Sequence, residues 1–148
     1  MRWILAVLHL LGLGIGLGAV WVRARALRDA LDLPGIRRVL AADSWWGIAA
    51  LIWVVTGVMR AFSGFEKGTT YYLQNYLFHT KLGLFLLILV LEVGPIVTFI
   101  AWRRQLAKGG SPDTSKAARF ATTSMVQVVL VVLMVIAATG MARGYGTR

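Results

Sequence analysis

The chain has 148 residues, of which 58% are hydrophobic and 15% are charged, and its mean hydropathy is +0.72. A soluble domain of this length does not need so much apolar sequence to fill its core, so the composition indicates a membrane protein. The net charge of +10 is spread over short basic runs between long apolar stretches, which is typical of membrane topology, and no nucleic-acid partner is expected. The chain has no cysteine, which excludes disulfides and thiolate metal sites.

Four continuous apolar segments lie at about 3–22, 44–62, 77–102 and 118–142. Each is close to the ~20 residues that a helix needs to cross a hydrocarbon core of ~30 Å. The segments do not alternate apolar and polar residues as the strands of a membrane barrel do. We therefore expect an all-α, integral membrane four-helix bundle, a single unit over residues 1–148 that lies in the lipid bilayer.

Local signals suggest where these helices begin. Pro34-Gly35 is expected to break the first connection, and Asp43 or Ser44 to cap the second helix. Asn75 is expected to cap the third helix.

The basic residues predict the orientation. Ten of the sixteen fall in the first and third connections, namely Arg23, Arg25, Arg28, Arg37, Arg38, Arg103, Arg104, Lys108, Lys116 and Arg119. The positive-inside rule makes these connections cytoplasmic and places both termini and the loop 63–76 outside, as in a multi-pass protein of the bacterial inner membrane. Several aromatic residues close to the predicted boundaries suit an interfacial belt: Trp3, Trp21, Trp45, Trp46, Trp102, Tyr71, Tyr72 and Tyr145.

Five ionisable residues inside the predicted spans need a partner or a function, because each costs roughly 2.5–3.5 kcal/mol at the centre of a membrane helix. They are His9, Arg60, His79, Lys81 and Glu92. All but Glu92 lie towards the outer surface, where a polar cluster among three helices is geometrically possible. The alternative is that Arg60 and Lys81 extend to the lipid headgroups.

Helical phase separates these candidates. Lys81, Phe85, Ile88 and Glu92 form one stripe, which we expect to face the bundle because Glu92 is costly to expose to lipid. His79 points about 200° away from Lys81 and is expected to face headgroups or the outer loop. It remains a candidate cofactor-binding residue only because it lies at the same depth in the membrane as the other candidates. Glu92 lies ~16 Å from Lys81 along the axis, and its expected partner is Gln127 or Arg23.

Glycines surround the histidine of the first segment. His9, Gly12 and Gly16 share a stripe, and Gly14 and Gly18 form a GxxxG pair beside it. Such glycines let another helix approach closely. The same groove could accept a flat macrocycle, with His9 as an axial iron ligand. In the fourth segment, a polar patch is expected to form hydrogen bonds between helices; it consists of Thr122, Thr123, Ser124 and Gln127.

Several motifs carry a family resemblance: Thr56-Gly57-Val58-Met59-Arg60, the stretch from Glu66-Lys67-Gly68 through Tyr71-Tyr72 to Asn75, Phe78-His79-Thr80-Lys81-Leu82, and Trp102-Arg103-Arg104. With Leu8-His9, Asp43 and Gly47, they closely resemble a bacterial family of four-helix membrane proteins, the domain of unknown function DUF twenty-two fourteen. This resemblance implies the fold and no activity. His9 and Lys81-Leu82 are also distantly similar to the HemJ type of protoporphyrinogen oxidase and to CopD membrane proteins. That resemblance implies a bound b-type haem and functional roles for His9 and Lys81.

Three functions follow as hypotheses. In the first, the protein is haem-associated or redox-active: His9 ligates the iron, Lys81 and Arg60 neutralise propionates, and Tyr71 and Tyr72 cover the site. In the second, it is a non-enzymatic accessory subunit of a larger respiratory or photosynthetic complex, or a homo-oligomer. In the third, it transports a small solute, and Glu92 beside Gly94-Pro95 marks a helix break. No nucleotide-binding loop and no HExxH or nucleophile motif occurs in the sequence, which leaves hydrolase mechanisms without residues.

Overall fold

The computed structural model describes residues 2–62 and 69–146, and these residues are almost entirely helical. The helices are α1 (Arg2–Ala26), α2 (Leu33–Phe62), α3 (Thr69–Gln74), α4 (Tyr76–Ala107) and α5 (Ala117–Ala142). Four of them, all but the short α3, are long and apolar enough to cross a membrane. The predicted all-α membrane bundle is confirmed.

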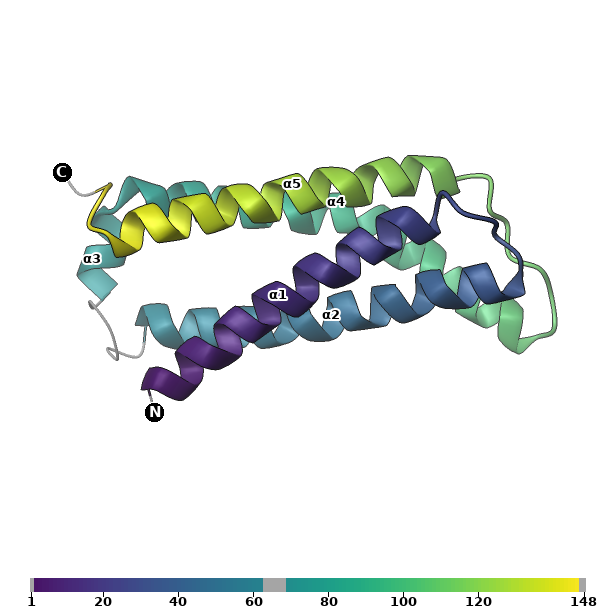
Figure 1. Cartoon of the computed structure of the whole chain (residues 1–148), viewed down its shortest axis with the longest axis horizontal. Coiled ribbons are helices and arrows are strands. Elements are labelled where there is room, and N and C mark those ends of the chain that lie inside the picture. Colours follow the sequence, from purple (N-terminus) through teal and green to yellow (C-terminus); the bar gives the residue numbers. More distant parts are fainter. Residues whose placement is uncertain (1, 63–68, 147–148) are drawn as a thin grey trace.

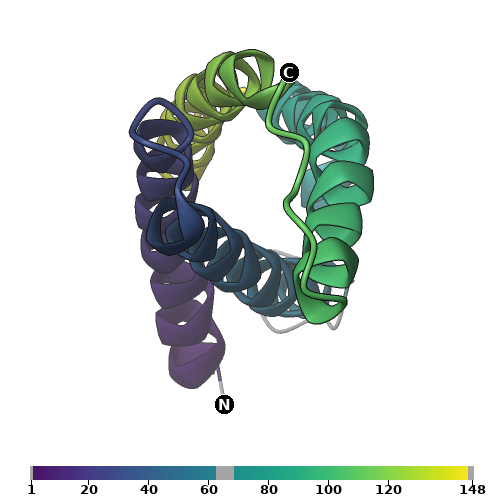
Figure 2. The same cartoon turned by 90° about the vertical axis from the view of Figure 1, so that its right-hand side faces the viewer.

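The long helices alternate in direction, so that α1 begins and α5 ends at the same end of the bundle (Figure 1). We call this end the terminal end, and we call the opposite end, with the α1–α2 and α4–α5 connections, the basic end. Viewed from the basic end, the helices follow one another in the order α1, α2, α4, α5 (Figure 2). α2 packs mainly on α1 and α4 mainly on α5, whereas α2 and α4 contact each other little, along what we call the α2–α4 seam.

The second helix begins eleven residues earlier than the sequence predicts, at Leu33 instead of Ser44. Asp32 caps it: its side-chain Oδ1 accepts from Gly35 N at 2.9 Å and its carbonyl accepts from Ile36 N at 2.9 Å. Pro34 lies in the first turn, where a missing N–H breaks no helical hydrogen bond. The prediction that Pro34-Gly35 breaks the connection and that Asp43 or Ser44 caps the helix is therefore wrong, because both capping candidates lie well inside α2.

The third long helix begins as predicted, because the Asn75 side chain accepts from Leu77 N at 2.9 Å. Asn75 is fully buried and donates through Nδ2 to Tyr145 O, while Tyr76 N donates to Gly146 O. These bonds tie the start of α4 to the segment after α5. α4 continues without interruption through Pro95, so the break expected at Gly94-Pro95 is wrong.

Two tryptophans expected at the membrane interface are in the core instead. Trp102 packs against Phe99 in the cluster at the basic end, and Trp46 belongs to the central cluster with Val20 and Met134. Trp102 tolerates burial because its Nε1 donates to the carbonyl of Asp113 at 2.9 Å. Trp3, Trp21, Trp45 and Tyr145 are exposed, as an interfacial role requires.

The α4–α5 connection at the basic end is ordered by its own hydrogen bonds. The Asp113 carboxylate accepts from Ser115 N at 2.9 Å, and this backbone bond, followed by the Ser115 hydroxyl, lowers the pKa of Asp113. Together with the bond from Trp102, these contacts hold the connection against the end of α4.

The predicted orientation can be tested directly, because the chain has no native cysteine. Ser111→Cys lies in the α4–α5 connection and Thr70→Cys lies on α3, and both positions are exposed. In spheroplasts we expect a membrane-impermeant maleimide to label Thr70→Cys at once and Ser111→Cys only after permeabilisation, because the positive-inside rule predicts that the basic end faces the cytoplasm. The opposite labelling pattern would contradict the orientation.

Candidate functional site

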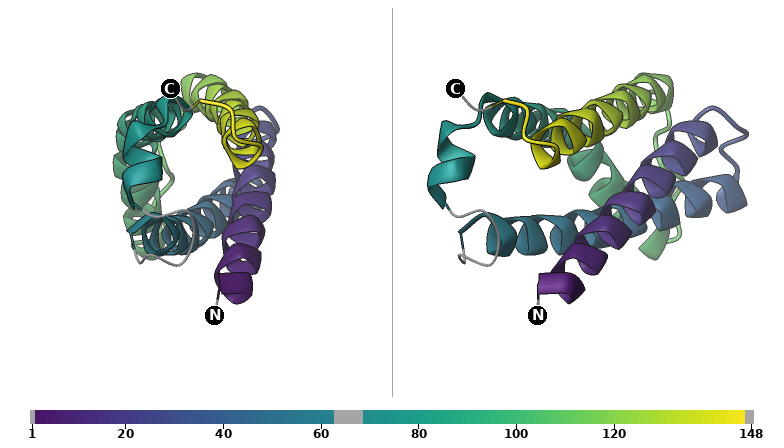
Figure 3. Two further views of the ribbon diagram at one scale, coloured as in Figure 1. Left: turned by 90° about the vertical axis from the view of Figure 1, so that its left-hand side faces the viewer. Right: turned by 60° about the vertical axis from the view of Figure 1, so that its left-hand side comes forward.

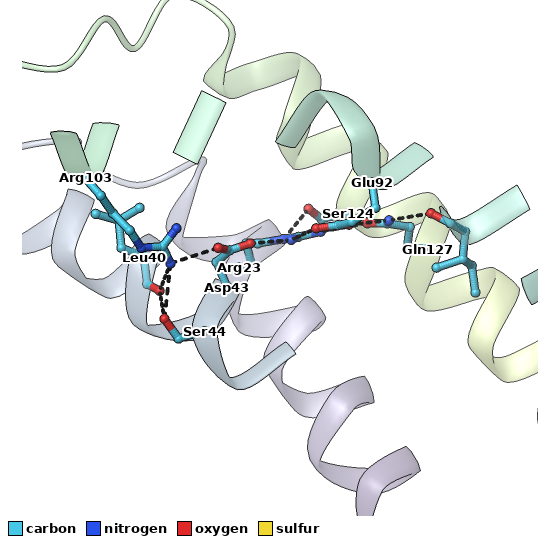
Figure 4. Close-up of polar contacts among 9 residues, drawn as sticks. Arg23, Leu40, Asp43, Ser44, Glu92, Arg103, Ser124 and Gln127 are labelled. Carbon is cyan, nitrogen blue, oxygen red and sulfur yellow. Dashed lines mark hydrogen bonds and ion pairs between the residues drawn. The ribbon is translucent and has the colours of Figure 1, made fainter. Parts of the chain in front are cut away.

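A fully buried arginine lies near the end of α1. Each of the five N–H groups of Arg23 donates a hydrogen bond (Figure 4). Nε donates to Ser124 Oγ at 3.1 Å, and Nη1 donates to Asp43 Oδ1 at 3.0 Å and to Glu92 Oε1 at 2.6 Å. Nη2 donates to Glu92 Oε2 and to Gln127 Oε1, both at 2.8 Å. The guanidinium is thus completely satisfied and forms a bidentate pair with Glu92.

The surrounding groups extend this arrangement across all four long helices. Gln127 Nε2 donates to Glu92 Oε2 at 2.6 Å, and Arg103 Nη2 donates to Asp43 Oδ2 at 2.9 Å. The Arg103 side chain is 38% exposed and connects the cluster to the basic end. We call these residues the Arg23 network: Arg23, Asp43, Glu92, Arg103, Ser124 and Gln127. Its two cationic and two anionic side chains balance, as a charge cluster in a low-dielectric interior requires.

The structure decides the partner of Glu92. Both candidates, Arg23 and Gln127, bond to it. The sequence predicts Arg23 in the first cytoplasmic connection. This placement is wrong, because α1 extends to Ala26 and the Arg23 side chain is buried. Arg103 likewise lies within α4. In the polar patch of the fourth helix, Ser124 and Gln127 do bond between helices, whereas the hydroxyls of Thr122 and Thr123 bond to carbonyls of their own helix.

A cavity of about 340 Å³ opens at the terminal end, which we call the terminal cavity. It brings together four candidate residues from four helices, namely His9, Arg60, Tyr71 and Lys81. Most of the remaining lining is apolar, including Leu10, Leu13 and Met134. Figure 3 shows α3, which carries Tyr71, at this end of the bundle.

His9 is held in one tautomer by α2. Its Nδ1 lies 2.9 Å from Thr56 Oγ1, and Thr56 Oγ1 in turn donates to the carbonyl of Ile52 at 2.7 Å. Because the single hydroxyl proton goes to that carbonyl, Oγ1 accepts from His9 Nδ1–H. In the neutral form of the ring, this hydrogen bond leaves the lone pair on Nε2. Gly57 makes the close approach possible, since a Cβ there would lie 3.2 Å from His9 Cε1.

Trp53 on α2 stands at the centre of the aromatic contacts. It stacks on His9 with ring centroids 5.4 Å apart, and Lys81 Nζ lies 5.4 Å from the centroid of its ring. Neither Trp53 nor Thr56 was singled out as a site residue from the sequence. Thr56 belongs, with Gly57, to a motif of the family resemblance, and this motif is the one sequence signal that points to Thr56. The motif does not include Trp53.

The other candidates have different surroundings. The Tyr71 hydroxyl donates to Met141 O at 2.9 Å, which attaches α3 to the end of α5. The side chain of Tyr72 lies outside the described residues. His79 is exposed, donates through Nε2 to Leu73 O at 2.9 Å, and does not line the terminal cavity. Its inclusion with the cofactor-binding residues is not supported, in agreement with its helical phase relative to Lys81.

The glycine stripe of α1 serves helix packing. A Cβ at Gly12 would lie 3.3 Å from Ala49 O, and one at Gly16 would lie 3.4 Å from the Trp46 side chain. α2 therefore packs closely along Gly12 and Gly16. Both glycines also line a cavity of about 220 Å³, and a macrocycle beside them stays a prediction. Gly14 and Gly18 lie on another side of α1, where a Cβ would meet no atom within 4 Å.

A family model described as "Predicted membrane protein (DUF2214)" matches residues 1–146. The chain belongs to this family. No curated protein and no solved structure matches the chain. The family resemblance seen in the sequence is thus confirmed over nearly the whole chain, and its membrane character agrees with the four candidate spans.

The Arg23 network predicts a specific pattern of stability. We expect Arg23→Met to destabilise the folded protein by about 3–5 kcal/mol, because it leaves Glu92 buried without a counter-charge. Adding Glu92→Gln should recover part of this loss, since the two residues are directly coupled. Unfolding in mixed detergent micelles measures both effects.

Arg25→Met is the matched control, because Arg25 lies on the same helix two residues away and is exposed. Its change in stability should stay within about 0.5 kcal/mol. Equal effects of the two arginine substitutions would contradict the role of the network.

Proposed function

We propose that this membrane protein binds haem b in the terminal cavity, with His9 as an axial ligand, in a bacterial inner membrane whose outer surface is next to the cavity. The observation that carries the proposal is the placement of His9: it lines the terminal cavity, and its Nδ1 lies 2.9 Å from Thr56 Oγ1, so that a neutral ring donating there keeps its lone pair on Nε2. A fixed hydrogen bond on the far nitrogen is the usual support of a metal-binding histidine.

The residues present fit this group in number and kind. Among the described residues, no three His, Asp or Glu side chains gather closely enough to hold a bare metal ion. Haem iron needs just one or two protein ligands, because the macrocycle supplies the other four. One neutral histidine in an apolar cavity is therefore sufficient for a haem and insufficient for an isolated metal.

The cations of the cavity support a ligand that carries carboxylates. Arg60 and Lys81 both line it, one from α2 and one from α4. Next to a low-dielectric interior, such cations interact strongly with carboxylates such as the haem propionates. The apolar side chains of the lining, such as Leu10, Leu13 and Met134, suit the body of a flat macrocycle.

When bound, haem would supply one-electron chemistry. The chain's own part is to orient the ligand through His9 and Thr56, to neutralise its carboxylates through Arg60 and Lys81, and to exclude water through the apolar lining. The proposal assigns no catalytic role to any residue of the cavity. It concerns the binding of a redox group within the membrane.

The proposal predicts a Soret absorption band, shifted by dithionite, in protein purified from haem-replete cells. His9→Ala should abolish the band, whereas His79→Ala should retain it, because His79 is exposed and bonds to Leu73 O. A wild-type protein without a Soret band, or a His9→Ala protein that retains it, removes the proposal.

Thr56→Val tests the supporting hydrogen bond. The substitution keeps the shape of the side chain and removes the oxygen that accepts from His9 Nδ1–H, so we expect haem affinity to fall roughly 10- to 100-fold. Titration of the apoprotein with haemin measures this change. An unchanged affinity would mean that Thr56 does not orient the ligand.

A further inference from the structure

The side chain of Arg103 crosses the α2–α4 seam near the basic end. Its Nη2 donates to the carbonyl of Leu40 at 3.0 Å, to Asp43 Oδ2 at 2.9 Å and to Ser44 Oγ at 3.1 Å (Figure 4). All of these bonds leave from one nitrogen of the guanidinium. The protein thus fixes one edge of the Arg103 head against α2.

The other donors of Arg103 reach the surface. Within residues 2–62 and 69–146, its Nε and Nη1 donate no hydrogen bond to the protein. Neither atom is buried, because Trp53 Nε1 is the buried side-chain atom of this part of the chain that lacks a partner. The Arg103 side chain is 38% exposed. An oriented guanidinium with accessible N–H groups is well suited to bind phosphate oxygens.

Two further arginines lie close to this head. Arg37 precedes Ser44 by seven residues, so both lie on the same face of α2, and Arg104 directly follows Arg103 on α4. Arg37 and Arg104 are exposed, and neither forms a hydrogen bond or salt bridge within the described residues. Three guanidinium groups from two helices therefore surround the basic end of the seam.

The charges at this place favour an anion. Asp43 balances Arg103 within the Arg23 network, and the carboxylate of Asp32 caps the start of α2. The positive charges of Arg37 and Arg104 have no such counter-charge among the described residues. An excess of positive charge on one face attracts anionic ligands.

An apolar strip continues from the arginines towards the middle of the bundle. Ile48 lies one turn beyond Ser44 on α2, and Ile100 and Ile96 lie about one and two turns before Arg104 on α4. All three isoleucines are exposed. The anion that fits this place is therefore one that carries hydrocarbon.

The position of the arginines along the helices corresponds to the membrane boundary. Ser44 begins the second apolar segment of the sequence, and Arg103 directly follows the third. Trp45, next to Ser44, is exposed, as expected for a tryptophan at the interface between hydrocarbon and headgroups. Lipid phosphates lie at this level.

We infer that Arg37, Arg103 and Arg104 bind the phosphate of an anionic phospholipid, whose acyl chains lie along the exposed isoleucines. Basic clusters that border membrane helices are typical of this recognition. A free phosphate would make no use of the apolar strip, and the cationic group of a zwitterionic phospholipid would offset the attraction to Arg37 and Arg104. The inference goes beyond the haem proposal and does not depend on it.

The test is native mass spectrometry of the delipidated full-length protein in mild detergent, titrated with dioleoyl phosphatidylglycerol or with dioleoyl phosphatidylcholine. We expect the first phosphatidylglycerol to bind more tightly than phosphatidylcholine. Arg37→Gln combined with Arg104→Gln should weaken phosphatidylglycerol binding by roughly fivefold per arginine. Neither residue belongs to the Arg23 network, so the bundle should stay folded.

Lys116→Gln combined with Arg119→Gln is the matched control. It removes the same charge at the start of α5, which does not contact α2 among the described helices, and it should leave the affinity nearly unchanged. An equal loss with both pairs would show a diffuse attraction to the basic end and overturn the inference, as would equal binding of the two phospholipids. Displacement of phosphatidylglycerol by millimolar inorganic phosphate would assign the arginines to a soluble anion and would also overturn it.

Discussion

The bundle depends on one interaction, the bidentate pair between Arg23 and Glu92. In a bilayer, apolar side chains gain little by leaving lipid for another helix, so packing and polar contacts select which helices meet. Here one guanidinium contacts α2, α4 and α5 from α1 and uses every donor that it has. A rotation of any of these helices by one residue would leave a buried charge without its partner, which makes the arrangement specific.

The Arg23 network lies towards the basic end of the bundle, away from the terminal cavity. Arg23, Asp43 and Arg103 hold the four helices together in the half that carries the basic connections. Towards the terminal end, the terminal cavity is lined by residues of all five helices. A membrane bundle can thus keep space for a ligand in one half because polar bonds stabilise the other.

Trp53 connects the two cavities. It stacks on His9 at the terminal cavity and also lines a cavity of about 220 Å³ between α1, α2 and α4. Thr56 and Gly57 lie next to it on α2, so one turn of this helix positions the histidine, admits its ring and lines both cavities.

The sequence by itself determined the four membrane helices, the Asn75 cap, the common level of His9, Arg60 and Lys81, and the need of Glu92 for a partner. These features follow from hydropathy, helical phase and the cost of a charge in lipid, which are properties of each segment alone. The tertiary structure decided that Arg23 is buried, that α2 begins at Leu33, that Trp46 and Trp102 lie in the core, and that Thr56 orients His9. Each of these depends on how one helix is rotated and extended against another, and no single segment contains that information.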